Sequence, residues 1–452
     1  MDTLSLPYTR KQNQEFRTRL LKSSYPRVLF VTPCAFNSMT GGGITFTNLF
    51  RGWPTERIAT VTDDAVPLSY DICTQYYRIT RKERRYIPPF CWVKDAQGVY
   101  IENEGTGTAK PSSRGFLISL LKSIIGNAGI PDQGRLSTDL SLWIEAYEPD
   151  VVYTILGSIG YIEIIDAIVT KYGFPLVVHF MDDGVTDPRQ KGLFGNYIRN
   201  ATSRRLKRLL SKSTKQMAIS MAMAEEYKRR YGMTFQPFQN TIDLSAHQHL
   251  FKEEVTPGTP VKIAYVGSVN PLNNFQGLLD LTHIMGPLNK TGNNAVLEIY
   301  SPRNLYGDYV ERLKNDPSIH IRPVPIDDET FFTVLNAADI LFLPVNFDKN
   351  SIQYIRLSMP TKVPAYLSSG TPVLVYGPAG VAQVDYARES GWGYVVDKRS
   401  LGDLLNAVQR LSSDSNLRDR LSKAAQQATL ENHNAEKVRS AFQRQMQAAG
   451  RP

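Results

Sequence analysis

Residues 351–378, SIQYIRLSMPTKVPAYLSSGTPVLVYGP, hold the pattern that decides how the rest of this sequence is interpreted. An apolar run at 371–376 has the continuous, β-branched character of a parallel strand that is buried on both faces. A helical pattern at 362–369 precedes it, and Gly370 separates the two. A hydroxyl, a lysine and the free amides of a helix start together suit a diphosphate group. The residues at this helix start are Ser358, Pro360, Thr361 and Lys362. The alternative is a capped helix with a solvated lysine.

Strand-like runs of the same kind recur along the chain. In the first half they cover residues 27–32, 57–62, 73–79, 151–156, 175–180 and 216–220. In the second half they cover residues 261–266, 295–300, 319–323, 339–344, 371–376 and 393–396. Helical patterns alternate with them at 44–51, 137–147, 161–171, 221–231, 275–285, 328–338, 362–369 and 401–411. This alternation predicts an α/β protein with two doubly wound, Rossmann-like domains. The boundary is predicted within residues 251–260, FKEEVTPGTP, which are rich in proline and poor in apolar residues.

The bulk composition narrows the class of protein. Of the 452 residues, 42% are hydrophobic and 21% are charged, as in ordinary globular proteins. Three cysteines, Cys34, Cys73 and Cys91, make a poor disulfide framework and predict reduced thiols. The polar first 24 residues lack the apolar core of a signal peptide, and the apolar stretch 151–169 contains Glu163 and Asp166. These observations predict a cytoplasmic protein.

The net charge of +9 leaves several partners open. Nucleic acid, an anionic membrane surface and a phosphorylated substrate all suit a basic chain. No RNA-reading signature or helix-turn-helix spacing is present, so no nucleic-acid partner is predicted. The basic run 199–215, with interleaved leucines, is either a solvated helix face or a membrane-attracted surface. The apolar segment 116–125 is either a core helix or an amphipathic helix on a membrane.

Three glycines follow the first predicted strand. Gly41, Gly42 and Gly43 open into an apolar helix. Glycines let a backbone approach a ligand closely, and a helix start favours an anion. The alternative is an ordinary flexible turn. A weaker version of this pattern follows the strand at 261–266, where Gly267 and Ser268 resemble a phosphate-facing turn without basic residues.

A cluster of titratable residues ends the strand at 175–180. His179, Asp182 and Asp183 would lie at its carboxyl end, where open α/β sheets bind ligands. A histidine near carboxylates can donate a hydrogen bond or act as a general base. The alternatives are a satisfied core histidine and a capping aspartate. Adjacent carboxylates also occur in ordinary turns, so no metal site and no bound cofactor are predicted.

These motifs, in their order, resemble those of glycosyltransferases of the GT-B fold, and most of all the bacterial enzymes of family 4. The resemblance covers nearly the whole chain. The segments that carry it are the glycine loop, AISMAMAEEY before NTID, YVGS at the start of the second half, and SMPTKVPAYLSSGTPVLVYGP.

The resemblance implies a division of labour between the domains. Residues 1–250 would form an acceptor-side domain, residues 261–430 a nucleotide-sugar domain, and residues 431–452 a helix that packs back on the first domain. Ser358 and Lys362 would face the diphosphate, and the backbone around Pro323 and Val324 would face the base. The glycine loop and His179 would border the donor sugar and the acceptor.

The sequence departs from the family pattern at several positions. Leu357 and Ala365 stand where the family commonly has two glutamates, and the second of these usually contacts the ribose. Ser268 and Asn274 stand near the places of an expected arginine and lysine, and Pro323 replaces a usual glycine.

The resulting hypothesis is a metal-independent hexosyltransferase that uses a nucleotide sugar, with retention inherited from the resemblance. Its acceptor would be a glycan or lipid-linked glycan of surface polysaccharide assembly, reached by peripheral attachment to the inner face of the membrane. Two alternatives are a nucleotide-sugar epimerase on the same fold and a non-catalytic glycan-binding subunit.

Overall fold

The computed structural model describes residues 25–88, 90, 130–184, 192–247, 251–252, 256–290, 292, 294–302, 307–325 and 327–450. The segment 116–125 and Cys91 lie outside the described residues. Cys34 and Cys73 both lie inside and are free thiols. Among the described helices, none combines the length and the apolar content that a bilayer crossing requires.

Two sheets organise the chain, as the strand pattern predicts. The first has the order β3-β2-β1-β6-β7-β8-β9 and the second the order β12-β11-β10-β13-β14-β15. The strands of the first sheet are β1 (Val28–Val31), β2 (Ile58–Thr62), β3 (Gln75–Arg78), β6 (Val151–Thr154), β7 (Leu176–Phe180), β8 (Lys215–Ala218) and β9 (Gln236–Pro237). Those of the second are β10 (Val261–Val266), β11 (Ala295–Tyr300), β12 (Ile319–Arg322), β13 (Ile340–Pro344), β14 (Val373–Tyr376) and β15 (Gly393–Val396). A small antiparallel pair, β4 (Arg84–Tyr86) and β5 (Asp132–Gly134), was not predicted.

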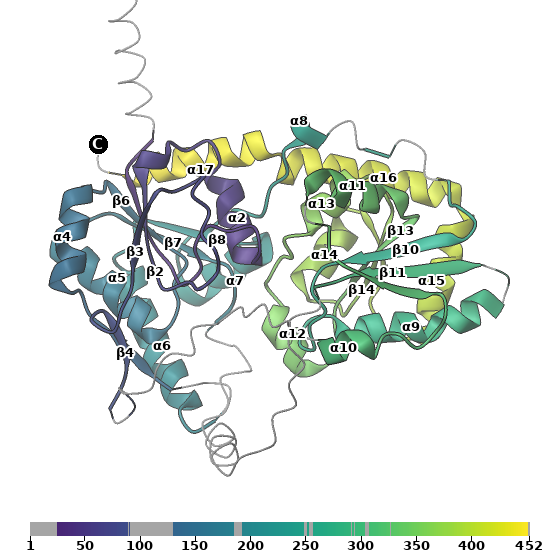
Figure 1. Ribbon diagram of the computed structural model, residues 1–452, viewed down its shortest axis with the longest axis horizontal. Helices are drawn as coiled ribbons and strands as arrows, with labels where there is room; N and C mark the ends of the chain where they lie inside the picture. Colours follow the sequence, from purple (N-terminus) through teal and green to yellow (C-terminus); the bar gives the residue numbers. More distant parts are fainter. Residues whose placement is uncertain are drawn as a thin grey trace, which may run out of the picture. The chain divides into compact units, whose positions relative to one another are not determined.

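Helices cover the sheets in the alternating manner of doubly wound domains (Figure 1). Those before β10 are α2 (Gly41–Phe50), α4 (Thr138–Tyr147), α5 (Ile159–Tyr172), α6 (Gly195–Leu210), α7 (Met221–Tyr231) and α8 (Leu244–His247). Those after it are α9 (Phe275–Lys290), α10 (Gly307–Glu311), α11 (Asp328–Ala337), α12 (Lys349–Ile355), α13 (Val363–Ser368), α14 (Ala382–Glu389), α15 (Leu401–Ser413), α16 (Ser415–Ala428) and α17 (Ala435–Ala449). A π-helical turn, η4 (Thr429–His433), lies between α16 and α17.

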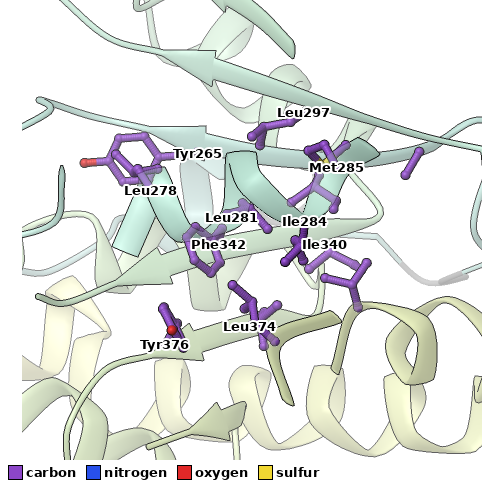
Figure 2. Packing of buried hydrophobic residues seen from close by; sticks show 14 of the residues in the cluster. Tyr265, Leu278, Leu281, Ile284, Met285, Leu297, Ile340, Phe342, Leu374 and Tyr376 are labelled. Carbon is purple, nitrogen blue, oxygen red and sulfur yellow. The ribbon is translucent and has the colours of Figure 1, made fainter. Parts of the chain in front are cut away.

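The second sheet is buried on both faces. Successive residues of β10 point in opposite directions, so Ile263 and Tyr265 join one hydrophobic cluster while Ala264 and Val266 join another. Figure 2 shows the first cluster, in which residues of α9 such as Leu278 pack against β10, β11, β13 and β14. This double burial explains why these strands are continuously apolar in sequence.

The described residues divide into two compact units. One lies within Met1–Phe180, Gln190–Met217 and Arg439–Pro452, and the other within Met181–Arg189 and Ala218–Val438. This division does not follow the predicted boundary at 251–260, because α7, α8 and the residues between them group with the second unit. Two hydrogen bonds contribute to that grouping, from Ser220 to the Leu357 carbonyl and from Asn240 to the Thr361 carbonyl.

The end of α17 belongs to the core of the first unit. Phe442 is fully buried, and its ring centroid lies 5.1 Å from that of Phe50 and 5.7 Å from that of Tyr153. The Arg439 guanidinium donates to the Asn48 carbonyl at 2.7 Å. Edge-to-face aromatic pairs of this kind stabilise a core beyond their buried area.

Candidate functional site

The carboxyl end of β10 and the start of α13 lie together in the second unit. Gly267 follows β10 with a φ of +139°, a conformation that side chains disfavour. Its N–H donates to the Tyr300 carbonyl at 2.8 Å. The Tyr366 hydroxyl accepts a hydrogen bond of 2.9 Å from the Val266 N–H, which fixes α13 to the end of β10. The predicted turn and the predicted helix start are therefore neighbours.

Lys362 lies directly against this turn. Its Nζ is 4.0 Å from the centroid of the Tyr265 ring. A Cβ placed on Gly267 would lie 2.4 Å from the same Nζ, so any larger residue here would displace the amine from the turn. The residue keeps some exposed surface, but its amine is enclosed by protein, and this burial lowers the pKa of Lys362 to about 7. An amine at this place gains charge and hydrogen bonds when an anion enters.

The turn itself is held by neutral groups. The Tyr265 hydroxyl donates to the Ser268 carbonyl at 2.7 Å, and Asn274 Nδ2 donates to the Tyr265 oxygen at 2.8 Å. Burial raises the pKa of Tyr265 well above its usual value, so the phenol stays protonated. Asn274 therefore braces the turn, while Ser268 is exposed beside it. Lys362 is the positive group that the structure brings to this turn.

We call residues 356–362 the lysine loop. Its two ends are anchored by carbonyl oxygens that accept from distant side chains. The Leu357 carbonyl accepts from Ser220 Oγ at 2.7 Å, and the Thr361 carbonyl accepts from Asn240 Nδ2 at 2.8 Å. Neither Ser220 nor Asn240 was predicted as a site residue. Both lie in segments that carry the family resemblance, AISMAMAEEY and NTID, but their partners lie 137 and 121 residues away in sequence, so the local pattern did not reveal these contacts.

Side chains also tie the lysine loop to its surroundings. The Arg356 guanidinium is 3.4 Å from Glu226 of α7. Ser358 Oγ donates to Asp182 Oδ1 at 3.0 Å. Ser358 is thus at the site, bonded to a carboxylate. The Pro360 carbonyl accepts from the Val363 N–H at 3.2 Å, which closes the first turn before α13.

The two adjacent aspartates have different environments. Asp182 is exposed, whereas Asp183 is buried. Asp183 forms an ion pair with Arg230, with a nitrogen–oxygen distance of 2.8 Å, and accepts from the Tyr227 hydroxyl at 3.1 Å. This network makes Asp183 an anchor for α7, while Asp182 is the carboxylate that solvent can reach.

His179 lies in the first unit, inside β7. It has no exposed surface, and its Nδ1 is 2.6 Å from the Tyr153 hydroxyl oxygen. Burial raises the pKa of Tyr153 well above its usual value, so this phenol is also protonated. The burial agrees with the alternative of a core histidine, and a role in catalysis stays a prediction.

The glycine loop of the first unit has a local structural reason. Thr40 caps α2 by accepting from the Gly43 N–H at 3.2 Å. A Cβ on Gly43 would lie 2.2 Å from the Asn37 side chain, and one on Gly42 would lie 3.2 Å from Cys34 Sγ. Gly43 is therefore needed for packing within the loop and Gly42 is closely packed, whereas Gly41 is exposed at the helix start.

Three further positions that the resemblance singled out lie in the second unit. Val324 follows β12 and packs on the cluster that contains Val266. Leu357 is buried, and Ala365 packs on this same cluster. The two positions that depart from the glutamate pattern therefore contribute apolar packing. Among the described residues, no group of three or more His, Cys, Asp or Glu could hold a metal ion.

The chain was compared with known proteins. No family model matches it, and no curated protein matches it. Solved structures do match over nearly their whole length. A glycosyltransferase from Rickettsia africae ESF-5 is 11% identical, with a TM-score of 0.59, and the match covers 94% of this chain and 98% of that one. Sucrose-phosphate synthase from Thermosynechococcus elongatus is 15% identical, with a TM-score of 0.59 and coverage of 94% and 100%. Anabaena HepE, in complex with UDP and glucose, is 11% identical, with a TM-score of 0.57 and coverage of 93% and 100%.

This chain has the GT-B fold. The two Rossmann-like sheets and the full-length matches to glycosyltransferase structures confirm the predicted fold class.

Proposed function

We propose that this protein is a glycosyltransferase that binds the diphosphate of a nucleotide sugar between Lys362 and the Gly267 turn. The observation that carries the proposal is the amine of Lys362 lying against a turn whose backbone conformation favours glycine. A nucleoside diphosphate supplies the negative charge that this amine requires. The similar structure of Anabaena HepE in complex with UDP and glucose supports a donor of this class.

The proposed chemistry needs a stabilised leaving group. The departing nucleoside diphosphate gains negative charge, and a positive group held in place lowers the energy of that state. Lys362 supplies this charge without a metal ion, and the anchored lysine loop supplies the positioning. Ser358 and Thr361 would complete the diphosphate contacts, and Val324 would face the base. We also propose that the transfer retains the anomeric configuration and that the protein is a member of family 4.

Asp182 is the carboxylate that we assign to the sugar. It is exposed and already bonded to Ser358 of the lysine loop. His179 and Asp183 would act indirectly, because both are buried and bonded to Tyr153 and Arg230. In the first unit, the helix start at Gly41 would serve the acceptor.

The acceptor is proposed to be a glycan or lipid-linked glycan at the cytoplasmic face of a membrane. Leu193 and Tyr197, at the start of α6, are 67% and 48% exposed. The same helix carries the exposed bases Arg204 and Lys207. Exposed apolar and basic side chains on one segment suit an anionic lipid surface.

A binding subunit without turnover is the second candidate. It is favoured by Leu357 and Ala365, which present no carboxylate where the family commonly has glutamates. Tight glycan binding without release of nucleotide, or activity only with an added partner, would support it. A sugar isomer formed without acceptor would indicate an epimerase instead.

Thermal unfolding with UDP, GDP, dTDP, CMP and ADP, each free and sugar-linked, tests the proposal. A ligand at 100 times its Kd should stabilise the protein by about 2.7 kcal/mol. We expect one base to give a clear rise in Tm with both forms. If every nucleotide leaves Tm unchanged, the diphosphate site is absent and the binding-subunit function takes its place.

A further inference from the structure

Hydrogen bonds link the lysine loop to residues that are distant from it in sequence. Asn240 Nδ2 donates to the Thr361 carbonyl at 2.8 Å, directly before Lys362. The backbone carbonyl of Asn240 is 3.1 Å from His433 Nδ1, in the π-helical turn η4. His433 Nε2 is 3.1 Å from the hydroxyl of Tyr386, on α14. Three segments that are distant in sequence are thus linked, one through the next, to one peptide of the loop.

The chemistry of these groups fixes the direction of each bond. A carbonyl oxygen can only accept a hydrogen bond, so His433 Nδ1 is protonated and donates to the backbone carbonyl of Asn240. Burial lowers the pKa of His433 to about 4, so the ring is neutral at pH 7 and Nε2 accepts. Burial raises the pKa of Tyr386 to about 12, so its hydroxyl is the donor to Nε2. The Tyr386 and Asn240 bonds share the imidazole ring of His433, so these two bonds strengthen each other. The side-chain amide of Asn240 then makes the separate bond to Thr361.

Two backbone hydrogen bonds hold the chain just after Asn240 against the end of η4. The Ile242 N–H donates to the His433 carbonyl at 2.9 Å, and the Ala435 N–H donates to the Ile242 carbonyl at 3.0 Å. Asn240 is itself only 8% exposed. The backbone at Asn240 is consequently held in place, and so is the starting point of the side chain that donates to the Thr361 carbonyl.

We infer that Asn240 is a positioning residue for the donor diphosphate, and that His433 and Tyr386 set the orientation of Asn240. The inference rests on the proposed function for its ligand. Lys362 follows the anchored carbonyl directly, so the bond from Asn240 helps to keep the amine against Gly267 and Tyr265. Without that bond the lysine loop gains freedom, and the amine is placed less well for a phosphate oxygen.

Asn240→Leu tests the inference, because leucine keeps the volume and removes the donor. We expect at least a 10-fold rise in Kd for the nucleotide that the thermal panel selects. The matched control is Asn289→Leu, which removes an asparagine that bonds both backbone groups of Ala295 at the opposite end of the second sheet. This control should lower Tm and leave Kd within twofold. Equal Kd values for Asn240→Leu and the wild type would overturn the inference.

A second readout does not depend on nucleotide. Competitive labelling with acetic anhydride across pH measures the pKa of Lys362 in the ligand-free protein. In Asn240→Leu we expect that pKa to rise by about one unit or more, because a freed amine is better hydrated. If the wild type binds no nucleotide, the proposed function fails, while this labelling still decides whether Asn240 positions Lys362. An unchanged pKa would contradict the inference.

Variants of His433 test the chain without touching Asn240 and cover the case in which Asn240→Leu does not fold. His433→Phe removes the Nδ1–H donor and should reproduce the loss of affinity in part. His433→Asn places an amide N–H near the former Nδ1 and should restore most of the affinity. If His433 has a purely structural role, both variants will lower Tm and neither will change the affinity for nucleotide. That result would overturn the inference.

Discussion

Lys362→Met is expected to weaken binding of the donor nucleotide about 100-fold or more while the protein stays folded. Methionine has a similar length and can keep the packing on Tyr265, but it has no charge for the diphosphate. Hydrogen bonds to charged groups contribute roughly 1.5–3 kcal/mol, and 2.7 kcal/mol corresponds to about 100-fold in Kd. Isothermal titration calorimetry measures the change directly. Lys262→Met, on an exposed lysine of β10, is the matched control and should bind normally.

The same site predicts a pH dependence of binding. The pKa of Lys362 is about 7 in the free protein because the amine is buried. A bound diphosphate favours the charged amine and raises that pKa, so binding above pH 7 takes up a proton. Affinity should therefore fall as pH rises above 7. Titrations in buffers of different ionisation enthalpy should show this proton uptake in the wild type and its loss in Lys362→Met. Equal uptake by both proteins would contradict the assignment.

Acidification is expected to destabilise the fold through His433. Burial lowers its pKa from 6.5 to about 4, so between these values the unfolded chain binds a proton that the folded chain does not. Stability contributed by the neutral ring is present above about pH 6.5 and is lost as the pH falls toward 4. Between pH 7 and pH 4.5 the loss amounts to about 2 kcal/mol in the free energy of unfolding.

Urea unfolding at the two pH values measures this loss. His433→Phe cannot titrate, so its free energy of unfolding should fall by about 2 kcal/mol less than that of the wild type over the same range. His320→Phe, which replaces an exposed histidine on β12, should keep the wild-type profile. Parallel profiles for wild type and His433→Phe would show that the buried ring is not the source.

The fold was predictable because strands buried on both faces are continuously apolar in sequence. The runs at 261–266 and 371–376 became β10 and β14, since alternate residues of such strands must satisfy opposite hydrophobic clusters. Helix ends were harder to place. The pattern ending at residue 285 continues as α9 to Lys290, through Gly286 and Pro287, because Leu288 still packs in the core. Tertiary packing outweighs local helix-breaking residues here.

The site was predictable only in part. Lys362 was identified because a lysine at a helix start carries a local signal, and Gly267 because it follows a strand. Asn240 and Ser220 lie in segments that carry the family resemblance, but no role was predicted for them, since their contacts reach across more than a hundred residues of chain. The sequence also could not separate Asp182 from Asp183. Adjacent residues point in different directions, and only the structure shows that the second one meets Arg230.

One measurement tests the central claim most directly. The wild-type protein is treated at pH 7 with pyridoxal 5′-phosphate, whose aldehyde forms an imine with an uncharged amine and whose phosphate occupies an anion site. Borohydride reduction and peptide mass spectrometry then locate the modified lysines. We predict that Lys362 is modified before the other lysines and is protected by the nucleotide that raises Tm. Modification spread over surface lysines, or labelling of Lys362 that nucleotide does not reduce, would contradict a diphosphate site at this residue.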